Sequence, residues 1–366
     1  MFADFFSDKI HKLHFNLLSN STENSPHTTP STSPNELTDF TCVTHEEIAK
    51  LISLSPDTYC DLDPIPTSLL KQCAYVLIPT ITKIINLSLA TGIFPAHFKS
   101  SLILPHLKKS TLDKEDLTNY RPISHLSFLS KLTERVVKIR LSTHLSTNHL
   151  LNSFQSAYTK FHSTESTLLA VHDHIINAMS QQKVTALCLL DLSAAFDTID
   201  HSILIHRLSS WFGLNGTVLT WLKSYLTSRS FKVCLNGSES SVYQLLYGVP
   251  QGSVLGPLLF ILYTTPLSSI ISQTPVNHHL YADDTQLYIS FSTLNFPANI
   301  SHLQDTISKI SHWMSSNLLS LNQSKTEFLL MGLPKQLSKI THPILQMSSD
   351  ISVSSVASAR NLWHHL

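Results

Sequence analysis

Two adjacent carboxylates, Asp283 and Asp284, stand at the start of a segment that has the alternation of a β-strand. Residues 285–291 place Leu287, Ile289 and Phe291 on one face, which is typical of a half-buried strand. Aspartate is depleted inside strands, and an Asp-Asp pair lacks the glycine of a favoured two-residue hairpin turn. Adjacent carboxylates repel each other unless a cation lies between them, and Mg²⁺ prefers oxygen ligands. The pair is therefore a candidate metal site, although an isolated pair of this kind is more often a solvated acidic turn.

Three other features of the chain have the residue types of a reactive site. Asp191 directly follows an apolar strand expected over residues 186–190, at the end of a strand where ligand-handling groups lie in open α/β sheets. It needs a partner, because an unpaired buried carboxylate costs several kcal/mol. The loop over residues 248–257 holds three of the eight glycines and precedes an apolar helix. Glycine lets a backbone approach a ligand closely, and a helix N-terminus favours anions. Lys325 begins a further predicted strand.

Hydrophobic periodicity predicts the elements that must position these residues. Helices are expected over residues 1–18, 67–91, 130–145, 199–211, 219–226 and 300–321, and strands over 101–107, 186–190, 231–235 and 325–330, with a hairpin at the Asp283-Asp284 pair. Asp61 and Asp63 precede the second of these helices, where its dipole explains them more simply than a metal does. A Ser/Thr/Pro-rich segment over residues 19–40 is expected to be a flexible linker.

The composition narrows the class of protein. The chain has 366 residues, of which 42% are hydrophobic and 14% charged, and its 25 basic residues balance its 25 acidic residues. A nucleic-acid binder usually has a basic excess, so this balance counts mildly against that class. The 21 histidines form no HExxH motif, and the five cysteines are scattered, which favours a reducing compartment. With no signal-type segment and no apolar run near 18 residues, we expect an intracellular protein (nucleus or cytoplasm) without a membrane partner.

Taken in chain order, these features suit nucleotidyl transfer. They are a carboxylate at a strand end, a glycine-rich helix entry, a carboxylate pair on a hairpin, and a lysine. Two metal ions about 4 Å apart stabilise the attacking and leaving oxygens of an in-line displacement, and carboxylates from two strands are needed to bridge them. Catalysis is then mostly positioning and charge neutralisation.

The ordered motifs resemble the reverse transcriptase domain of a non-LTR retrotransposon, of the LINE type and the CR1/L2 kind. The matching stretches lie within residues 40–335 and are residues 119–124 (NYRPIS), 190–197 (LDLSAAFD), 248–257 (GVPQGSVLGP), 281–284 (YADD) and 324–327 (SKTE). The resemblance implies an α+β fold with the fingers and palm of a right-hand polymerase, an antiparallel palm sheet with flanking helices, and a thumb that is largely missing. It also implies RNA-directed DNA synthesis on an RNA template, with a DNA primer, dNTPs and two Mg²⁺ ions (Mn²⁺ is an alternative). No protein partner is implied.

The resemblance also assigns roles to individual residues. Asp191 and Asp283 would bind the metal ions with support from Asp284, and Lys325 would donate a proton to the leaving pyrophosphate, although a lone lysine there is more often solvated. Phe196 would be the bulky gate against a ribose 2′-hydroxyl, with a core aromatic as the plain alternative. The remaining residues implied in nucleotide or template binding are Gln251, Gly252, Arg121 and Lys160.

Domain boundaries and two departures follow from the same resemblance. We expect an N-terminal helix over 1–18, the linker over 19–40, an N-terminal helical extension over 41–110, fingers over 111–185, a palm with interleaved fingers segments over 186–340, and a truncated tail over 341–366. The family commonly has an arginine at the position of Thr159, and neighbouring Lys160 would face the opposite side if the segment is extended. Thumb and endonuclease regions are expected to be missing, as in a truncated copy. The alternative is therefore an impaired nucleic-acid-binding relic. Phe196 argues against a third possibility, an RNA-templated RNA polymerase.

Overall fold

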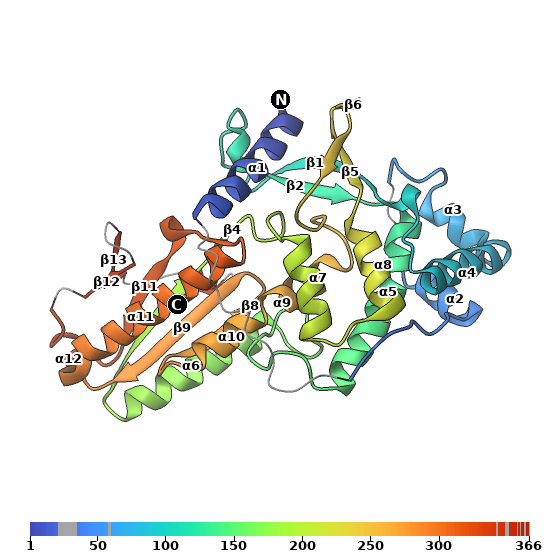
Figure 1. Ribbon diagram of the computed structural model, residues 1–366. Coiled ribbons are helices and arrows are strands. Elements are labelled where there is room, and N and C mark those ends of the chain that lie inside the picture. Colours follow the sequence, from blue (N-terminus) through green and yellow to red (C-terminus); the bar gives the residue numbers. More distant parts are fainter. Residues whose placement is uncertain are drawn as a thin grey trace. The chain divides into compact units, whose positions relative to one another are not determined.

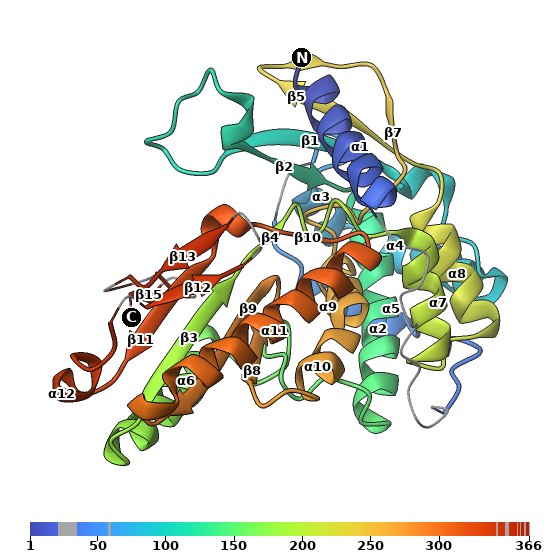
Figure 2. The same ribbon diagram turned by 60° about the vertical axis from the view of Figure 1, so that its left-hand side comes forward.

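The structure is a computed structural model that describes residues 1–20, 35–57, 60–341, 343–347, 351–356, 358, 360–361 and 364–365. Its contacts divide the chain into two compact units (Figures 1 and 2). The first unit comprises the described parts of residues 1–16, 28–150 and 196–263, and the second those of 17–27, 151–195 and 264–366. The predicted linker falls largely on residues 21–34, which lie outside the described residues.

Helices form most of the regular secondary structure of the first unit. They are α1 (Phe2–Asn20, whose end belongs to the second unit), α2 (His45–Ser53), α3 (Thr67–Gln72), α4 (Ala74–Thr91), α5 (Phe128–Thr147), α7 (His201–Ser210), α8 (Gly216–Leu226) and α9 (Gly256–Thr264), with short 3₁₀ turns η1 (Ala96–Phe98) and η2 (Leu117–Asn119). Side chains cap several of them; Ser127 accepts from Ser130 N–H at α5 and Asp200 from Ile203 N–H at α7. The single helix predicted over 67–91 is wrong, because non-helical Cys73 separates α3 from α4.

The helix α4 bears on the expectation that the chain has no apolar segment near 18 residues in length. It has 18 residues with a mean hydropathy of 1.3, so by length and composition it is apolar enough to cross a membrane. Core helices of globular proteins have the same character. Ile81, Ile85 and Leu89 of α4 are buried and α4 contacts both α2 and α8, but Val76 and Leu87 are exposed and 28% of the helix is buried.

The first unit contains a mixed sheet in the strand order β2-β1-β5-β6, with β7 also paired to β5. Its strands are β1 (Ser100–Leu107), β2 (Tyr120–His125), β5 (Arg229–Leu235), β6 (Ser238–Glu239) and β7 (Tyr243–Leu245). β1 pairs antiparallel to β2 and parallel to β5. Ala3 and Phe6 of α1 pack against Ile103, Phe231 and Val233 of this sheet, so the predicted N-terminal helix exists and covers the sheet (Figure 2).

The second unit is built on an antiparallel sheet in the order β11-β3-β9-β8. Its elements are α6 (Thr164–Ser180), β3 (Val184–Leu190), β4 (Leu192–Ser193), α10 (Pro266–Ile271), β8 (Asn277–Tyr281), β9 (Asp284–Phe291), η3 (Thr293–Asn295), α11 (Phe296–Ser316), β10 (Ser320–Leu321), η4 (Gln323–Lys325), β11 (Glu327–Met331), α12 (Pro334–Leu337), β12 (Ile344–Gln346), β13 (Ser352–Ser354), β14 (Arg360–Asn361) and β15 (His364–His365). The strand predicted at 186–190 and the hairpin are confirmed. The strand predicted over 325–330 exists but begins at Glu327, so Lys325 lies in the 3₁₀ turn η4 before it, and the helix predicted to reach residue 321 ends at Ser316.

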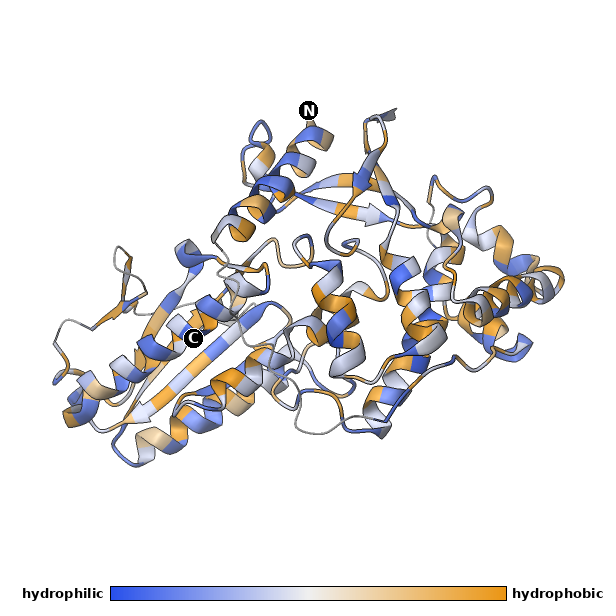
Figure 3. Ribbon diagram, in the orientation of Figure 1, coloured by the Kyte–Doolittle hydropathy of each residue, from blue (hydrophilic) through white to orange (hydrophobic). Residues whose placement is uncertain are grey.

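Both faces of the central strand β3 are buried, as its unbroken apolar run predicts. Val171 and Ile175 of α6 pack against Leu187 of β3 and Leu329 of β11. The opposite face carries Ala186 and Cys188, which have no exposed surface, and α11 also contacts β9. Figure 3 shows hydrophilic residues at the hairpin end of β9 and more hydrophobic ones further along the strand. The polar end of the sheet is therefore the end that carries the carboxylates.

Candidate active site

The Asp283-Asp284 pair lies at the tip of the β8–β9 hairpin. Tyr281 and Asp284 form the last cross-strand pair, so Ala282 and Asp283 are the two turn residues. Ala282 has a φ of 54°. This left-handed conformation costs a non-glycine residue about 1–2 kcal/mol. Because the turn has alanine at this position and not glycine, the backbone directly before Asp283 is strained.

Asp191 reaches the same end of the sheet from the neighbouring strand. The antiparallel register of β3 and β9 ends at the pair Leu190 and Thr285, so Asp191 and Asp284 adjoin this last pair at the same end of the sheet, near enough for the charge of Asp191 to raise the pKa of Asp284. The position of Asp191 was expected from a rule for open α/β sheets. That reason is wrong, because the sheet is antiparallel and the pairing of β3 with β9 places the residue.

A segment after α11 completes this end of the sheet. β10 pairs with β4 directly after Asp191, and the Asn322 N–H donates to the Asp191 carbonyl at 2.8 Å. The Lys325 ammonium donates to Asp191 Oδ2 at 2.5 Å, although 64% of the lysine side chain is exposed. Lys325 is therefore both solvated and paired. Asn322, whose amide also approaches Asp191 Oδ2 at 3.4 Å, was not found from the sequence.

The carboxylates influence one another strongly. Burial, and then the charges of Asp283 and Asp191, raise the pKa of Asp284 to about 7, while Lys325 opposes the rise. Within the described residues, no three His, Cys, Asp or Glu side chains form a ready metal site. The donor set nevertheless fits a hard divalent cation, because it consists of mutually repelling carboxylates and already attracts one cation, the Lys325 ammonium.

The glycine-rich loop of the first unit packs against β2. The Ser124 N–H donates to the Gln251 carbonyl at 2.7 Å. Gly252 has a φ of 112°, and a Cβ there would lie 2.6 Å from the Ser124 carbonyl oxygen. Only glycine fits this position. Arg121 lies three residues before Ser124 on the same strand and is exposed, so the structure brings these three predicted residues onto one strand and its adjoining loop.

The side chain of Gln251 turns towards a carboxylate that the sequence did not single out. Its amide Nε2 donates to both oxygens of Asp197, at 2.8 and 2.7 Å. Asp197 follows Phe196, whose ring is stacked on Phe260 with 5.0 Å between the centroids. Phe196 is half-buried and packs on another aromatic ring, and its role as a gate stays a prediction.

The helix N-terminus after the glycine-rich loop already has its anion. Glu134 of α5 is fully buried, and its Oε2 accepts from the Val254 and Leu255 N–H groups at 2.8 and 3.0 Å, just before α9. The Tyr225 hydroxyl donates to the same oxygen at 3.2 Å. The expectation that this helix end serves an external anion is wrong at these two N–H groups, because an internal carboxylate satisfies them.

Lys160 does not join the carboxylates. Its ammonium lies 4.7 Å from the centroid of the Phe161 ring. The surrounding segment forms turns, with positive φ at Tyr158 and Phe161, so the extended geometry considered for Thr159 and Lys160 does not occur. The Thr159 hydroxyl donates to the Gln155 carbonyl at 3.3 Å.

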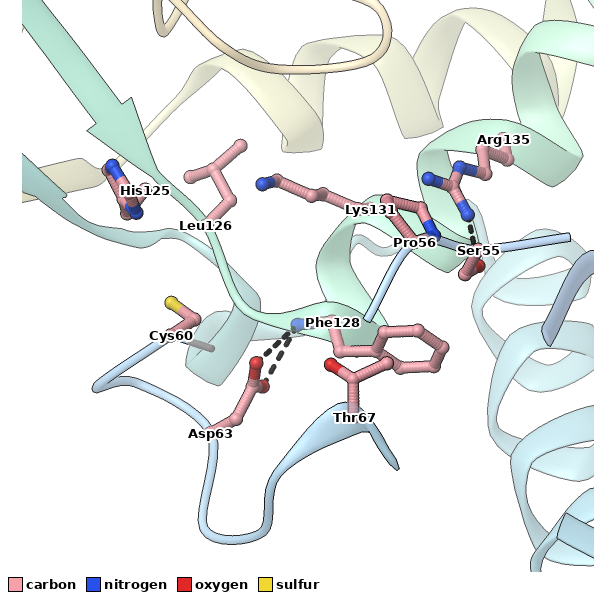
Figure 4. Close-up of a pocket in the computed structure, with 10 residues that line it drawn as sticks. All are labelled: Ser55, Pro56, Cys60, Asp63, Thr67, His125, Leu126, Phe128, Lys131 and Arg135. Atoms are coloured by element: carbon pink, nitrogen blue, oxygen red, sulfur yellow. Dashed lines mark hydrogen bonds between the residues drawn. The ribbon is translucent and has the colours of Figure 1, made fainter. Parts of the chain in front are cut away.

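A cavity of about 330 Å³ lies in the first unit (Figure 4). Both carboxylate oxygens of Asp63 accept from the Phe128 N–H there, at 2.9 and 3.1 Å, so Asp63 caps α5 and not the helix that follows it in sequence. Lys131 and Arg135 also line the cavity, and Arg135 donates to Ser55. None of the residues predicted for the active site lines it.

Comparison with known proteins identifies the family. The family model for reverse transcriptase (RNA-dependent DNA polymerase) matches residues 108–356, a span that includes the two opposed strands, the hairpin and the glycine-rich loop. The chain belongs to the reverse transcriptase family.

Relatives of this reverse transcriptase domain come from non-LTR transposons. It is 32% identical over 310 residues to the probable RNA-directed DNA polymerase from transposon BS of Drosophila melanogaster, covering 82% of this chain and 33% of the relative. It is 30% identical over 295 residues to the RNA-directed DNA polymerase from mobile element jockey of the same organism, covering 77% and 31%. For the probable RNA-directed DNA polymerase from transposon X-element, the values are 28% over 283 residues, 75% and 30%. The chain spans about a third of the length of these relatives.

The Asp197 carboxyl is expected to make the stability of this reverse transcriptase domain depend on pH. Burial raises its pKa from 3.8 to about 6, while the Gln251 amide opposes the rise. The folded protein then holds this proton more tightly than the unfolded chain, so the stabilisation is complete below about pH 4 and is lost as the pH rises through 6. From pH 4.5 to 7, wild type is expected to lose about 1–2 kcal/mol of unfolding free energy relative to Asp197→Asn. Urea denaturation of both proteins at the two pH values measures this, and equal pH dependence would contradict it.

Proposed function

We propose that this reverse transcriptase domain catalyses RNA-directed DNA synthesis, joining dNTPs to the 3′-hydroxyl of a DNA primer on an RNA template. The observation that carries the proposal is that Asp191 and Asp284 lie at the same end of the paired strands β3 and β9, with Asp283 at the adjoining turn and Lys325 paired to Asp191. Family membership and the relatives' names support it, and these carboxylates supply the acidic centre that nucleotidyl transfer needs.

Asp191 and Asp283 would hold two Mg²⁺ ions, or Mn²⁺ in their place, with Asp284 lowering the local potential beside them. When bound, the ions activate the primer hydroxyl and neutralise charge on the pyrophosphate that leaves. Lys325, which donates to Asp191 Oδ2, would share this carboxylate with a bound cation. Its Nζ would be the group that donates a proton to the leaving pyrophosphate.

Residues 111–185 would act as the fingers and residues 186–340 as the palm with interleaved fingers segments, so the antiparallel sheet of β11, β3, β9 and β8 would be the palm sheet. Gln251, held by Asp197, and Gly252, packed on Ser124, would form a fixed wall for template and nucleotide. Arg121, on the same β-strand as Ser124, would contact a phosphate group of the template or of the dNTP. Phe196 would exclude a nucleotide with a 2′-hydroxyl. Lys160, in its exposed turn, would attract a phosphate group.

Primer extension tests the proposal directly. The purified chain is incubated with Mg²⁺, an RNA template annealed to a labelled DNA primer, and dNTPs, and elongated primer is expected. A preference for rNTPs over dNTPs would instead favour an RNA polymerase and remove the gate role of Phe196. Salt-sensitive binding of the duplex with no incorporation under Mg²⁺ or Mn²⁺ would favour the impaired relic, for which Thr159 at the family's arginine position is the specific observation.

The change Thr159→Arg is expected to lower the KM for dNTPs about tenfold, because a guanidinium binds a triphosphate through paired, charge-assisted hydrogen bonds. The substitution loses only the long hydrogen bonds from the threonine hydroxyl to the Gln155 and Ala157 carbonyls. Steady-state primer extension measures the KM, with Thr159→Gln as a polar control without charge. An unchanged KM in Thr159→Arg would exclude a triphosphate contact at this position.

A further inference from the structure

A single buried side chain holds the strained turn of the candidate active site. Gln155 is 5% exposed. Its Oε1 accepts from the Ala282 N–H at 3.0 Å, and its Nε2 donates to the Ala282 carbonyl at 3.4 Å. Both polar backbone groups of the residue directly before Asp283 are therefore bonded to one amide.

The amide is itself fixed by its surroundings. Oε1 of Gln155 also accepts from the Ala157 N–H at 2.9 Å, which closes a local turn and sets the orientation of the side chain. Because the carboxamide carries both an acceptor and a donor, no apolar side chain of the same size reproduces these contacts.

The loop that carries Gln155 is bonded to β8, the edge strand of the sheet. Ser156 N–H donates to the Leu280 carbonyl at 3.0 Å, and the Leu280 N–H donates to the Phe154 carbonyl at 2.8 Å. The Ser156 hydroxyl further contacts His279 Nε2 at 2.8 Å. This pairing extends the sheet by one short segment and brings Gln155 to the hairpin tip.

We propose that Gln155 is a positioning residue, which holds the Ala282 peptide in its left-handed conformation and thereby aims the Asp283 carboxylate for cation binding. The inference rests on the proposed function for its catalytic consequence. A non-glycine residue leaves this conformation readily unless its surroundings hold it. Loss of the amide therefore allows the turn to relax and Asp283 to occupy several positions, each of which binds a cation more weakly.

The test compares Gln155→Met, which keeps the volume but loses the hydrogen bonds, with wild type. The Mg²⁺ concentration for half-maximal primer extension is expected to rise about tenfold, while the KM for primer–template stays unchanged. Gln336→Met is the matched control, because Gln336 is a buried glutamine of α12 that bonds to Gln182 and Lys339. A merely structural effect would change the activity of Gln155→Met and Gln336→Met alike. It would also change the Mg²⁺ requirement and the KM for primer–template together.

Rescue by glycine tests the strain directly. Ala282→Gly removes the conformational penalty, so Gln155→Met/Ala282→Gly is expected to recover at least half of the lost Mg²⁺ affinity on a logarithmic scale. Effects of the two changes that simply add, or an unchanged Mg²⁺ requirement in Gln155→Met, would overturn the proposal.

A second readout separates this inference from the proposed function. If the wild-type chain extends no primer, the proposed function fails, and titration of the full chain with Mn²⁺ followed by electron paramagnetic resonance still decides the role of Gln155. Weaker Mn²⁺ binding in Gln155→Met than in Gln336→Met supports it. Equal binding in the two variants, or no Mn²⁺ binding by wild type, refutes it.

Discussion

Replacing Asp191 or Asp283 with asparagine is expected to lower the rate of primer extension by on the order of a thousandfold. Asparagine keeps the shape of each side chain but removes the negative charge that holds a divalent cation. For Asp191 the change also deprives Lys325 of its ionic partner. That loss has little effect on folding, because the lysine is largely exposed and ion pairs of this kind stabilise by less than about 1 kcal/mol.

The measurement is incorporation of labelled dNTP under single-turnover conditions, at Mg²⁺ concentrations high enough to saturate wild type. Asp305→Asn is the matched control, since Asp305 is an exposed acid of α11 in the same unit, and its rate is expected to equal that of wild type. Extension that survives in an Asp191→Asn/Asp283→Asn double variant would show that the cation site lies elsewhere in the chain.

The sequence predicted the parts of the site that depend on local pattern. Alternation over residues 285–291 identifies β9, and the apolar run before Asp191 identifies β3. Both signals arise because side chains alternate along a strand and because buried strands are apolar. The two strands that carry the carboxylates, and the hairpin between β8 and β9, are therefore predictable from the order of the residues alone.

Contacts between distant segments had no signal of this kind. Asn322 lies 131 residues from Asp191, and Gln155 lies 127 residues from the Ala282 that it holds. The hydrophobic periodicity of a sequence depends on residues that are close together in the chain. These hydrogen bonds depend instead on which distant strands become neighbours in the sheet. The pairing of Gln251 with Asp197 could not be predicted for the same reason. The order and spacing of the sequence motifs indicated the family. Only the fold revealed which side chains hold the candidate catalytic carboxylates in place.

The glycine-rich loop combines a correct prediction of a helix with a wrong prediction of what binds at the N-terminus of that helix. The apolar helix after residue 256 was expected, and its N-terminus does attract an anion. That anion is Glu134, which comes from α5 and lies 120 residues away from Val254. A buried carboxylate is expensive, and burial raises the pKa of Glu134 while the charge of Arg229 lowers it. Because burying this carboxylate is unfavourable, we infer that the conformation of the glycine-rich loop depends on its hydrogen bonds to Glu134.

Glu134→Ala is expected to lower the unfolding free energy by about 3–5 kcal/mol, because three buried donors, the Val254 and Leu255 N–H groups and the Tyr225 hydroxyl, lose a carboxylate acceptor. Arg229, which is 1% exposed and donates to the Tyr225 carbonyl at 3.0 Å, also loses the nearby negative charge, an attraction that shows in the lowering of the Glu134 pKa by Arg229. Urea denaturation measures the loss, and exposed Glu115 provides the control, with Glu115→Ala expected to change stability by less than about 0.5 kcal/mol.

The double variant Glu134→Ala/Arg229→Met identifies which effect dominates. If the cost of Glu134→Ala comes mainly from the guanidinium that loses this nearby negative charge, removing Arg229 as well makes the double variant more stable than the sum of the single changes predicts. If it comes mainly from the loop N–H groups, the two changes add. A loss below about 1 kcal/mol in Glu134→Ala itself would contradict both explanations, because it would mean that the N-terminus of α9 keeps its place without the carboxylate.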